Sequence, residues 1–191
     1  MKKMVVGITG ASGSLYAKRL IEVLLEKKVE VHVIATDMGE QVFSYEIGYP
    51  LEQFIMKQQE VYGNQVVLED PHNLFAGVAS GSHAYEGVVI LPCSMGTLAE
   101  IAHGFSKNLL TRAADVSLKE GRKLIIVPRE TPFSTIHLEN MLCLNKAGAT
   151  ILPAMPGFYH GPKELMDLVD FVVGKILDQL HIEHQLFKKW E

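Results

Sequence analysis

The chain of 191 residues has few cysteines, little net charge and no long apolar run. Its two cysteines cannot form a disulfide framework, and they fit a reducing compartment. The net charge is −4 and both signs are mixed along the chain, so no basic surface for nucleic acid is indicated. No apolar run is long enough to cross a bilayer, and the run after Met1-Lys2-Lys3 stops at a glycine loop, without a secretory signal. We therefore expect a cytoplasmic protein that binds neither nucleic acid nor membranes.

What the chain does contain is an alternation of short apolar runs and amphipathic segments. Its hydrophobic fraction of 48% is ordinary for a sheet that is covered on both faces. We predict one α/β domain over residues 1–191, folded as a three-layer αβα sandwich around a parallel sheet. Strands are expected at Met4–Thr9, Val29–Ala35, Val66–Leu68, Val88–Leu91, Leu124–Val127 and Thr150–Leu152, and helices at Leu15–Lys27, Thr97–His103, Leu109–Glu120, Ser134–Ala147 and Lys163–Leu180.

Three regions outside this alternation are also informative. Residues 48–64 and 69–86 show little regularity and are expected to be long loops, which in compact domains are often functional. The last helix, Lys163–Leu180, is apolar on more than one face. It is either a core helix covered by the C-terminal tail or part of a subunit interface, and we expect residues 163–191 to take part in oligomer contacts.

The most informative single segment is the end of the fifth predicted strand. The apolar run Leu124–Val127 stops abruptly at Pro128-Arg129-Glu130-Thr131-Pro132. Two opposite charges between prolines at the carboxyl end of a strand lie where open α/β sheets bind ligands. A generic turn would more often contain Gly, Asn or Asp, so Arg129 and Glu130 are interpreted as a functional pair rather than as solvated charges.

A glycine-rich loop, Gly7–Gly13, follows the first strand and opens the first helix. Glycine permits close backbone approach, and a helix amino end offers free N–H groups, so a phosphate fits there with Ser12 as a further donor. The spacing G-x-x-G-x-x-G is neither the dinucleotide pattern nor a Walker A loop. Asp37 follows the second strand, where a nicotinamide enzyme has its ribose-binding acid, so a dehydrogenase remains an alternative.

A second turn suited to a ligand, Pro92–Thr97, follows the fourth strand. It contains small residues, two hydroxyl groups and another helix start. Ser94 or Thr97 could also be no more than a helix N-cap. Cys93 is expected to be a packed thiol, because no cationic residue lies beside it in sequence. Two such turns at two strand ends suit a ligand with a phosphate tail and a flat ring system.

These turns belong to a longer series of motifs that occur together and in order: GITGASG (7–13), ASGS (79–82), PCSMGTL (92–98), LLTRAADVSLKE (109–120), VPRETPFSTIHLENM (127–141) and LPAMPGFYH (152–160). The series resembles the UbiX-like flavin prenyltransferases over nearly the whole chain. The resemblance implies a flavodoxin-like, Rossmann-like fold and assembly into homo-dodecamers. It implies an enzyme that joins the dimethylallyl group of dimethylallyl monophosphate to reduced FMN, at N5 and then C6, without a metal. A UbiD-type decarboxylase would receive the prenylated FMN.

The resemblance also implies the residues of the site. Contacts to FMN would fall on Gly10, Ala11, Ser12, Thr36, Ser94, Met95, Gly96, Thr97 and Arg129. The prenyl phosphate would contact Ser80, Gly81, Arg112, Lys119, Glu130, Tyr159 and Lys175. The catalytic groups would be Glu130, Ser12, Glu46 and Lys119.

The side chains assigned to the phosphate have physical support and open alternatives. Arg112 and Lys119 are seven residues apart, so they share one face of a helix, and cations suit a phosphate dianion. Without the motif, a solvated helix face would be the simpler interpretation. The Tyr159 hydroxyl could reach the same cleft, or its ring could pack in the core. Lys175 stands where close relatives usually carry arginine; it keeps the positive charge but lacks the bidentate fork.

The histidines suggest no metal site. His181 and His184 are three residues apart without a further ligand cluster, as in a solvated tail. His103, His137 and His160 lie close to the motifs, and each is expected to be a hydrogen-bonded structural histidine.

Two other functions stay open. An FMN-dependent cysteine decarboxylase would share the fold, but its Pro-x-Met-Asn motif is absent, since Pro92-Cys93-Ser94-Met95 occupies that turn. A non-catalytic FMN carrier would not need the cations that accompany Glu130.

Overall fold

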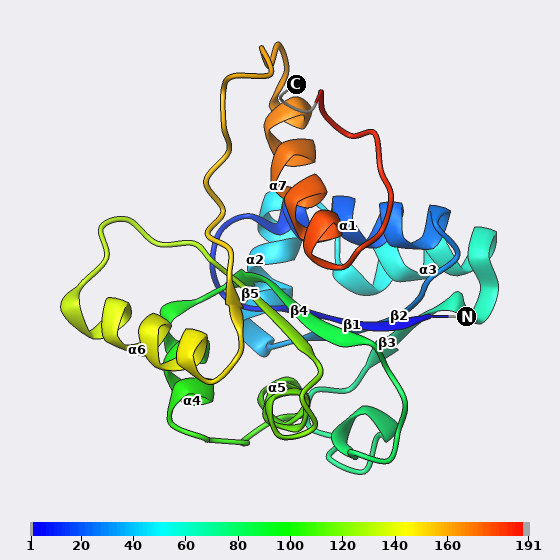
Figure 1. Ribbon diagram of the computed structural model, residues 1–191. Helices are drawn as coiled ribbons and strands as arrows, with labels where there is room; N and C mark the ends of the chain where they lie inside the picture. Colours follow the sequence, from blue (N-terminus) through cyan, green and yellow to red (C-terminus); the bar gives the residue numbers. More distant parts are fainter. Residues whose placement is uncertain (1, 189–191) are drawn as a thin grey trace.

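The protein folds around a six-stranded parallel sheet, as seen in a computed structural model that describes residues 2–188 (Figure 1). The strand order is β3-β2-β1-β4-β5-β6, and all five ladders between neighbouring described strands are parallel. The strands are β1 Lys3–Ile8, β2 Glu30–Ala35, β3 Val66–Glu69, β4 Gly87–Cys93, β5 Lys123–Pro128 and β6 Thr150–Ile151. The helices are α1 Ser14–Glu26, α2 Asp37–Ile47, α3 Leu51–Tyr62, α4 Met95–Ala102, α5 Leu109–Lys119, α6 Thr135–Lys146 and α7 Leu165–Gln179.

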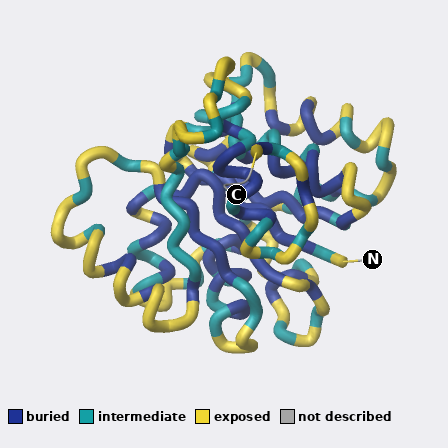
Figure 2. Tube along the Cα trace, turned by 45° about the horizontal axis from the view of Figure 1, so that its top comes forward, coloured by how far each residue is buried: buried dark blue, intermediate teal, exposed yellow. Residues whose placement is uncertain are grey.

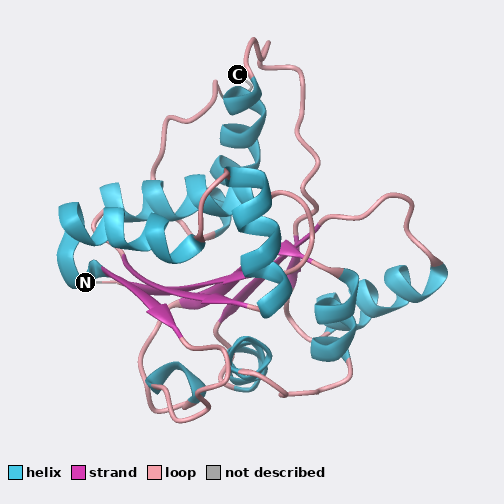
Figure 3. Ribbon diagram, turned by 180° about the vertical axis from the view of Figure 1, so that it is seen from behind, coloured by secondary structure: helices cyan, strands magenta, loops and turns pink. Residues whose placement is uncertain are grey.

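Helices cover both faces of the sheet, which makes the three-layer αβα sandwich that the sequence predicts. Helices α1, α2, α3 and α7 pack on one face, and α4, α5 and α6 pack on the other (Figures 1 and 3). Because both faces are covered, the strands are apolar at successive positions, and these positions are buried (dark blue in Figure 2). Val33, Val6, Val89 and Ile125 lie side by side across four strands without solvent exposure, and each stabilises the fold by roughly 2 kcal/mol.

The expectation of a loop over residues 48–64 is wrong. Helix α3 occupies most of that range, and α2, just before it, is a helix that the sequence analysis did not assign. Only Leu51, Phe54 and Ile55 of α3 are buried, so its apolar stripe is narrow and its helical period is weak in sequence. The second expected loop, residues 69–86, is confirmed apart from a short 3-10 helix at Gly77–Ala79.

Helix α7 is covered in its second half by the chain's own tail. A Cβ at Gly174 would lie 2.5 Å from the Phe187 ring and 2.7 Å from the His184 ring, so the tail seats directly on that glycine. At the other end of the helix, the Leu165 side chain is 66% exposed. The segment before α7 rises with it beyond the sheet (Figure 1). The core-helix interpretation therefore holds for one half of α7, and the other half remains available for contacts.

The strand order places a crevice at one edge of the sheet. From β1 the chain winds through β2 and β3 to one side, and from β4 it winds through β5 and β6 to the other. The carboxyl ends of β1 and β4 are neighbours at this reversal, which is where open α/β sheets bind ligands. Among the described helices, none combines the length and the apolar character that a membrane span requires.

Candidate active site

A cleft of about 410 Å³ opens at the carboxyl edge of the sheet, beside the reversal of strand order. It is lined by Gly10 after β1, Thr36 after β2, and Ser94, Gly96 and Thr97 after β4, all expected from the sequence to contact a flavin. Four further residues of the lining, Asp37, Met38, Glu100 and Asn108, were not predicted for the flavin site. Asn108 is the N-cap of α5 and Asp37 begins α2, so helix-start signals could have found these two.

Hydroxyl side chains fix the two loops that form the cleft. Thr36 caps α2 by accepting the Gly39 N–H at 3.1 Å, and Ser94 caps α4 by accepting the Thr97 N–H at 3.3 Å. The N-cap alternative for Ser94 is thus confirmed. Thr9 ties the loops together, because its Oγ1 donates to the Pro92 carbonyl at 2.8 Å and accepts the Ser94 N–H at 2.7 Å.

Glycine positions leave room for a ligand at the amino end of α4. A Cβ at Gly96 would meet no atom within 4 Å, so this first turn is open to the cleft. A Cβ at Gly10 would lie 2.7 Å from the Met38 Cβ, so the close approach of these loops requires glycine. An unobstructed helix amino end with hydroxyl groups around it suits a phosphate group. Ala11 and Met95 are buried and do not line the cleft.

The amino end of α1 is not free, contrary to expectation. Glu46 of α2 accepts the Gly13 N–H at 3.0 Å and the Ser14 N–H at 2.8 Å. Burial raises the pKa of Glu46, but hydrogen bonds from the Ser12 side chain and from these N–H groups outweigh it, and the net pKa lies below its ordinary value. A carboxylate of the chain itself therefore occupies the place where a phosphate was expected.

Arg129 and Glu130 lie at the carboxyl end of β5, as the sequence predicts. The Arg129 Nε donates to the Ser12 carbonyl at 3.2 Å, which brings the guanidinium to the loop that follows β1. Glu130 accepts the Thr131 N–H at 3.0 Å and is partly exposed. The pair thus borders the same edge of the sheet as the cleft described above, which we call the flavin-type cleft.

Arg112, Lys119, Ser80 and Gly81 form a second group, which we call the α5 cation group. The Arg112 Nε donates to the Ala79 carbonyl at 3.1 Å, and a Cβ at Gly81 would lie 3.0 Å from the Lys119 Nζ. Both cations therefore face the loop before β4 from one side of α5, which confirms their shared helix face. Each also has an acidic neighbour, Asp115 or Glu120.

Tyr159 and Lys175 form a third group, which we call the α7 group, around the Phe171 ring of α7. The Tyr159 ring packs edge-on against Phe171 with centroids 5.6 Å apart, and the Lys175 Nζ lies 5.7 Å from the same centroid. Tyr159 is half-exposed, so it is not a ring sealed in the core.

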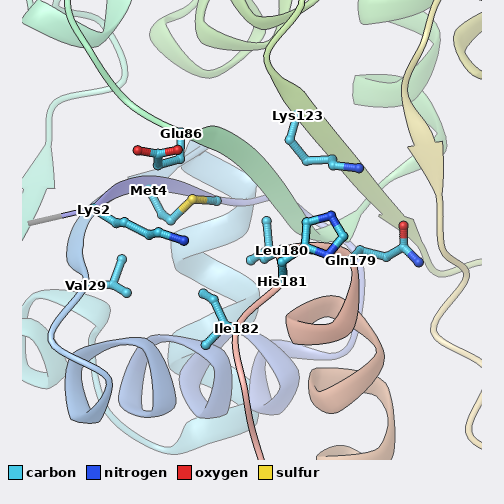
Figure 4. A pocket seen from close by; sticks show the side chains of 9 residues that line it. All are labelled: Lys2, Met4, Val29, Glu86, Lys123, Gln179, Leu180, His181 and Ile182. Carbon is cyan, nitrogen blue, oxygen red and sulfur yellow. The ribbon is translucent and has the colours of Figure 1, made fainter.

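One chain does not bring these groups together in a single cavity. Lys119 precedes β5 and Glu130 follows it, and a six-residue strand separates their backbones by roughly 20 Å. None of the α5 cation group or the α7 group lines the cleft. A second hollow of about 200 Å³ lies at the opposite edge of the sheet, lined by Lys2, Lys123, His181 and their neighbours, and contains none of the predicted site residues (Figure 4).

Other candidate groups have structural explanations. Cys93 is fully buried, and burial raises the pKa of its thiol well above the ordinary value. Its assignment as a packed thiol is confirmed. His137 caps α6 by accepting the Ser134 N–H, and His184 is buried against Asp178. Within residues 2–188, no three His, Cys, Asp or Glu side chains gather to hold a metal ion.

Comparison with known proteins gives a consistent set of matches. Residues 1–177 match the flavoprotein family model. The flavin prenyltransferase UbiX of Alkalihalophilus pseudofirmus is 53% identical, over 99% of this chain and 96% of its own length. A dodecameric FMN-dependent UbiX-like decarboxylase from Escherichia coli O157:H7 has a TM-score of 0.92 and 39% identity, with 99% of both chains covered. AnUbiX (PadA1), solved with FMN and dimethylallyl pyrophosphate, has a TM-score of 0.92 and 36% identity, covering 100% of this chain and 97% of its own.

Proposed function

Since this chain belongs to the UbiX-like flavin prenyltransferase family, we propose that it transfers a dimethylallyl group from dimethylallyl monophosphate to reduced FMN. The new bonds would form at N5 and C6 of the flavin. One observation carries the proposal. The chain has a cleft of nucleotide size, and it also has cationic side chains that do not line this cleft and are available for a second anionic substrate.

The cleft fits FMN. The FMN phosphate would bind at the open first turn of α4, near Thr36, Ser94 and Thr97. Arg129, at the end of β5, would contact the flavin ring system. When bound, reduced FMN supplies the nucleophilic positions of the reaction. Glu130 would hold or move a proton at the ring edge. Ser12 and Glu46 would form a hydroxyl–carboxylate pair beside Arg129, which donates to the Ser12 carbonyl.

The cations would act on the leaving group. Arg112, Lys119 and Lys175, with the Tyr159 hydroxyl, would stabilise the negative charge that develops on the departing phosphate when its bond to the prenyl carbon breaks. This is the role that a metal ion has in many phosphate reactions, so we propose metal-independent chemistry. Lys175 would bind as a point charge rather than as a bidentate fork, so phosphate affinity would differ from that of relatives with arginine.

We propose that neighbouring copies complete the site. The α5 cation group and the α7 group lie apart from the cleft within one chain, and the segments that carry or flank them expose Met155, Phe158 and Leu165. Leu138 and Leu142, one turn apart on α6, form a further exposed apolar surface. The UbiX-like relative from Escherichia coli is dodecameric, and we propose the same assembly here, with residues 163–188 among the contacts. The last three residues of the range predicted for these contacts, 189–191, lie outside the described part of the chain.

The proposal includes the fate of the product. Prenylated FMN would pass to a UbiD-type decarboxylase, and both proteins would act in the cytoplasm. The relative AnUbiX was solved with the pyrophosphate, so the monophosphate and the diphosphate are both substrates to compare.

Product analysis tests the proposal. The protein is incubated anaerobically with reduced FMN and dimethylallyl monophosphate, and the flavin is analysed by mass and absorption. We expect FMN to gain one C5H8 unit and an altered spectrum. Recovery of unmodified FMN would favour the carrier alternative, and release of CO2 from a cysteine-ended peptide would favour the decarboxylase alternative.

A further inference from the structure

An aromatic cluster joins the segment before α7, the helix itself and the tail. It consists of Tyr159, His160, Phe171, His184 and Phe187. His160 stacks on Phe171 at 5.3 Å between ring centroids, and both histidine rings contact Phe187, His160 at 6.1 Å and His184 at 5.4 Å. The cluster therefore contains two imidazoles in similar apolar surroundings.

His184 has a hydrogen-bond partner at each ring nitrogen. Its Nε2 lies 3.2 Å from the Asp178 carboxylate, and its Nδ1 accepts the Leu186 N–H at 3.3 Å. This is the arrangement expected for a structural histidine, because buried polar atoms normally have partners.

His160 has none at either nitrogen. Both Nδ1 and Nε2 are buried, and neither has a hydrogen-bond partner among the described residues. The expectation of a hydrogen-bonded structural histidine is therefore wrong for His160. Burying a polar group without a partner destabilises a protein by about 1–3 kcal/mol, so such a group calls for a functional explanation.

The position of His160 indicates what its partner is. The Phe171 centroid lies 5.3 Å from the His160 ring centroid, 5.6 Å from that of Tyr159 and 5.7 Å from the Lys175 Nζ. His160 thus shares its support with the α7 group, the two side chains proposed to bind the prenyl phosphate. The half-exposed Tyr159 ring lies edge-on to His160 with centroids 5.9 Å apart, so a turn of that ring would uncover the imidazole.

We propose that His160 is a further substrate-binding residue, whose ring N–H donates to a phosphate oxygen of the prenyl substrate when the Tyr159 ring turns aside. The inference rests on the proposed function, because it assigns a further donor to the same phosphate. It explains why an imidazole stands where a phenyl ring would pack without any unpaired polar atom.

Paired substitutions separate binding from packing. His160→Phe keeps an aromatic ring on Phe171 and removes both nitrogens, and His184→Phe is the matched control in the same cluster. The measurements are thermal unfolding, FMN affinity, and calorimetric titration of dimethylallyl monophosphate into the assembly loaded with oxidised FMN. Inorganic phosphate is titrated in parallel, to distinguish recognition of the prenyl substrate from binding of phosphate alone.

His160→Phe is expected to unfold at the wild-type temperature or higher and to bind FMN normally, but to bind the prenyl phosphate roughly tenfold more weakly. His160→Asn, which restores an N–H, should recover part of that affinity. His184→Phe should unfold at a lower temperature and bind the prenyl phosphate like the wild type.

Wild-type affinity in His160→Phe, or a failure of that variant to fold, would overturn the inference, because either result makes the ring a packing element. A wild-type protein that binds no prenyl phosphate would instead overturn the proposed function itself.

Discussion

Glu46 binds the amino end of α1 through Ser14, with its Oε2 2.8 Å from the Ser14 nitrogen. The two residues are 32 positions apart, and the contact joins α2 to the start of α1. Glycine loops at such helix ends commonly receive a phosphate, but here the chain supplies the anion itself. Under the proposed function, the FMN phosphate would instead bind at the neighbouring helix start at α4, while the Glu46 carboxylate stays beside Ser12.

The first prediction concerns Glu46→Gln and pH. The pKa of Glu46 is lowered from its ordinary value of 4.5 in the folded protein. The Glu46 charge therefore stabilises the fold at a pH above 4.5, and this contribution is lost as the pH falls through the lowered pKa. Glu46→Gln should reduce the free energy of unfolding by about 1 kcal/mol at pH 7. Urea unfolding from pH 7 to 3 should show the two proteins converging in acid; a constant difference over that range would contradict the assignment.

Arg129→Ala should weaken FMN binding. The guanidinium spans from β5 to the Ser12 carbonyl at the flavin-type cleft, and loss of a charged hydrogen-bond donor there should lower FMN affinity roughly tenfold. Fluorescence titration measures the affinity for FMN. Lys57→Ala is the control, because it removes a cation on α3 that does not line the cleft. Equal FMN affinity in the wild type and Arg129→Ala would remove Arg129 from the flavin site.

Lys175 should affect the prenyl substrate and leave the flavin unaffected. Lys175→Ala should raise the KM for dimethylallyl monophosphate roughly tenfold without a change in FMN affinity, because a charge that contacts phosphate is lost. Lys175→Arg should lower that KM below the wild-type value, since the fork can bind bidentately. An unchanged KM in Lys175→Ala would show that the ammonium only packs over Phe171 and Phe187.

Glu130→Gln should separate binding from chemistry. The amide keeps the size of the side chain and its contact with the Thr131 N–H, so FMN should bind normally. Product formation should fall about a hundredfold, as for loss of a group that moves a proton. The rate is measured from prenylated flavin at saturating substrates, and turnover near the wild-type rate would count against a role for Glu130.

Sequence reasoning located the cleft because its signals are local. The apolar strands, the glycine turn at Gly10 and the cap at Ser94 each depend on residues close together in the chain. Glu46 at the α1 terminus and the tail on Gly174 depend on packing between distant segments, and no local pattern encodes either contact. The unpartnered nitrogens of His160 follow from burial, which a motif cannot express.

The position of Lys119 was predictable only relative to its own helix. Spacing placed it on one face with Arg112, and the structure confirms that face. Its distance from Glu130 depends on the direction in which α5 and β5 run, with one residue before the strand and the other after it. The distance between Lys119 and Glu130 therefore follows from the topology and not from local spacing. Because of this distance, we propose a site that is shared between copies.

The most direct measurement of this account is complementation between two defective chains. Glu130→Gln and Lys119→Ala chains are co-expressed with different tags, assemblies that carry both tags are isolated, and prenylated FMN formation is compared with each variant alone. If each site takes Glu130 from one copy and Lys119 from another, the mixed assembly should recover roughly a quarter of the wild-type rate, while each variant alone stays inactive. A mixed assembly as inactive as its parents would contradict a shared site.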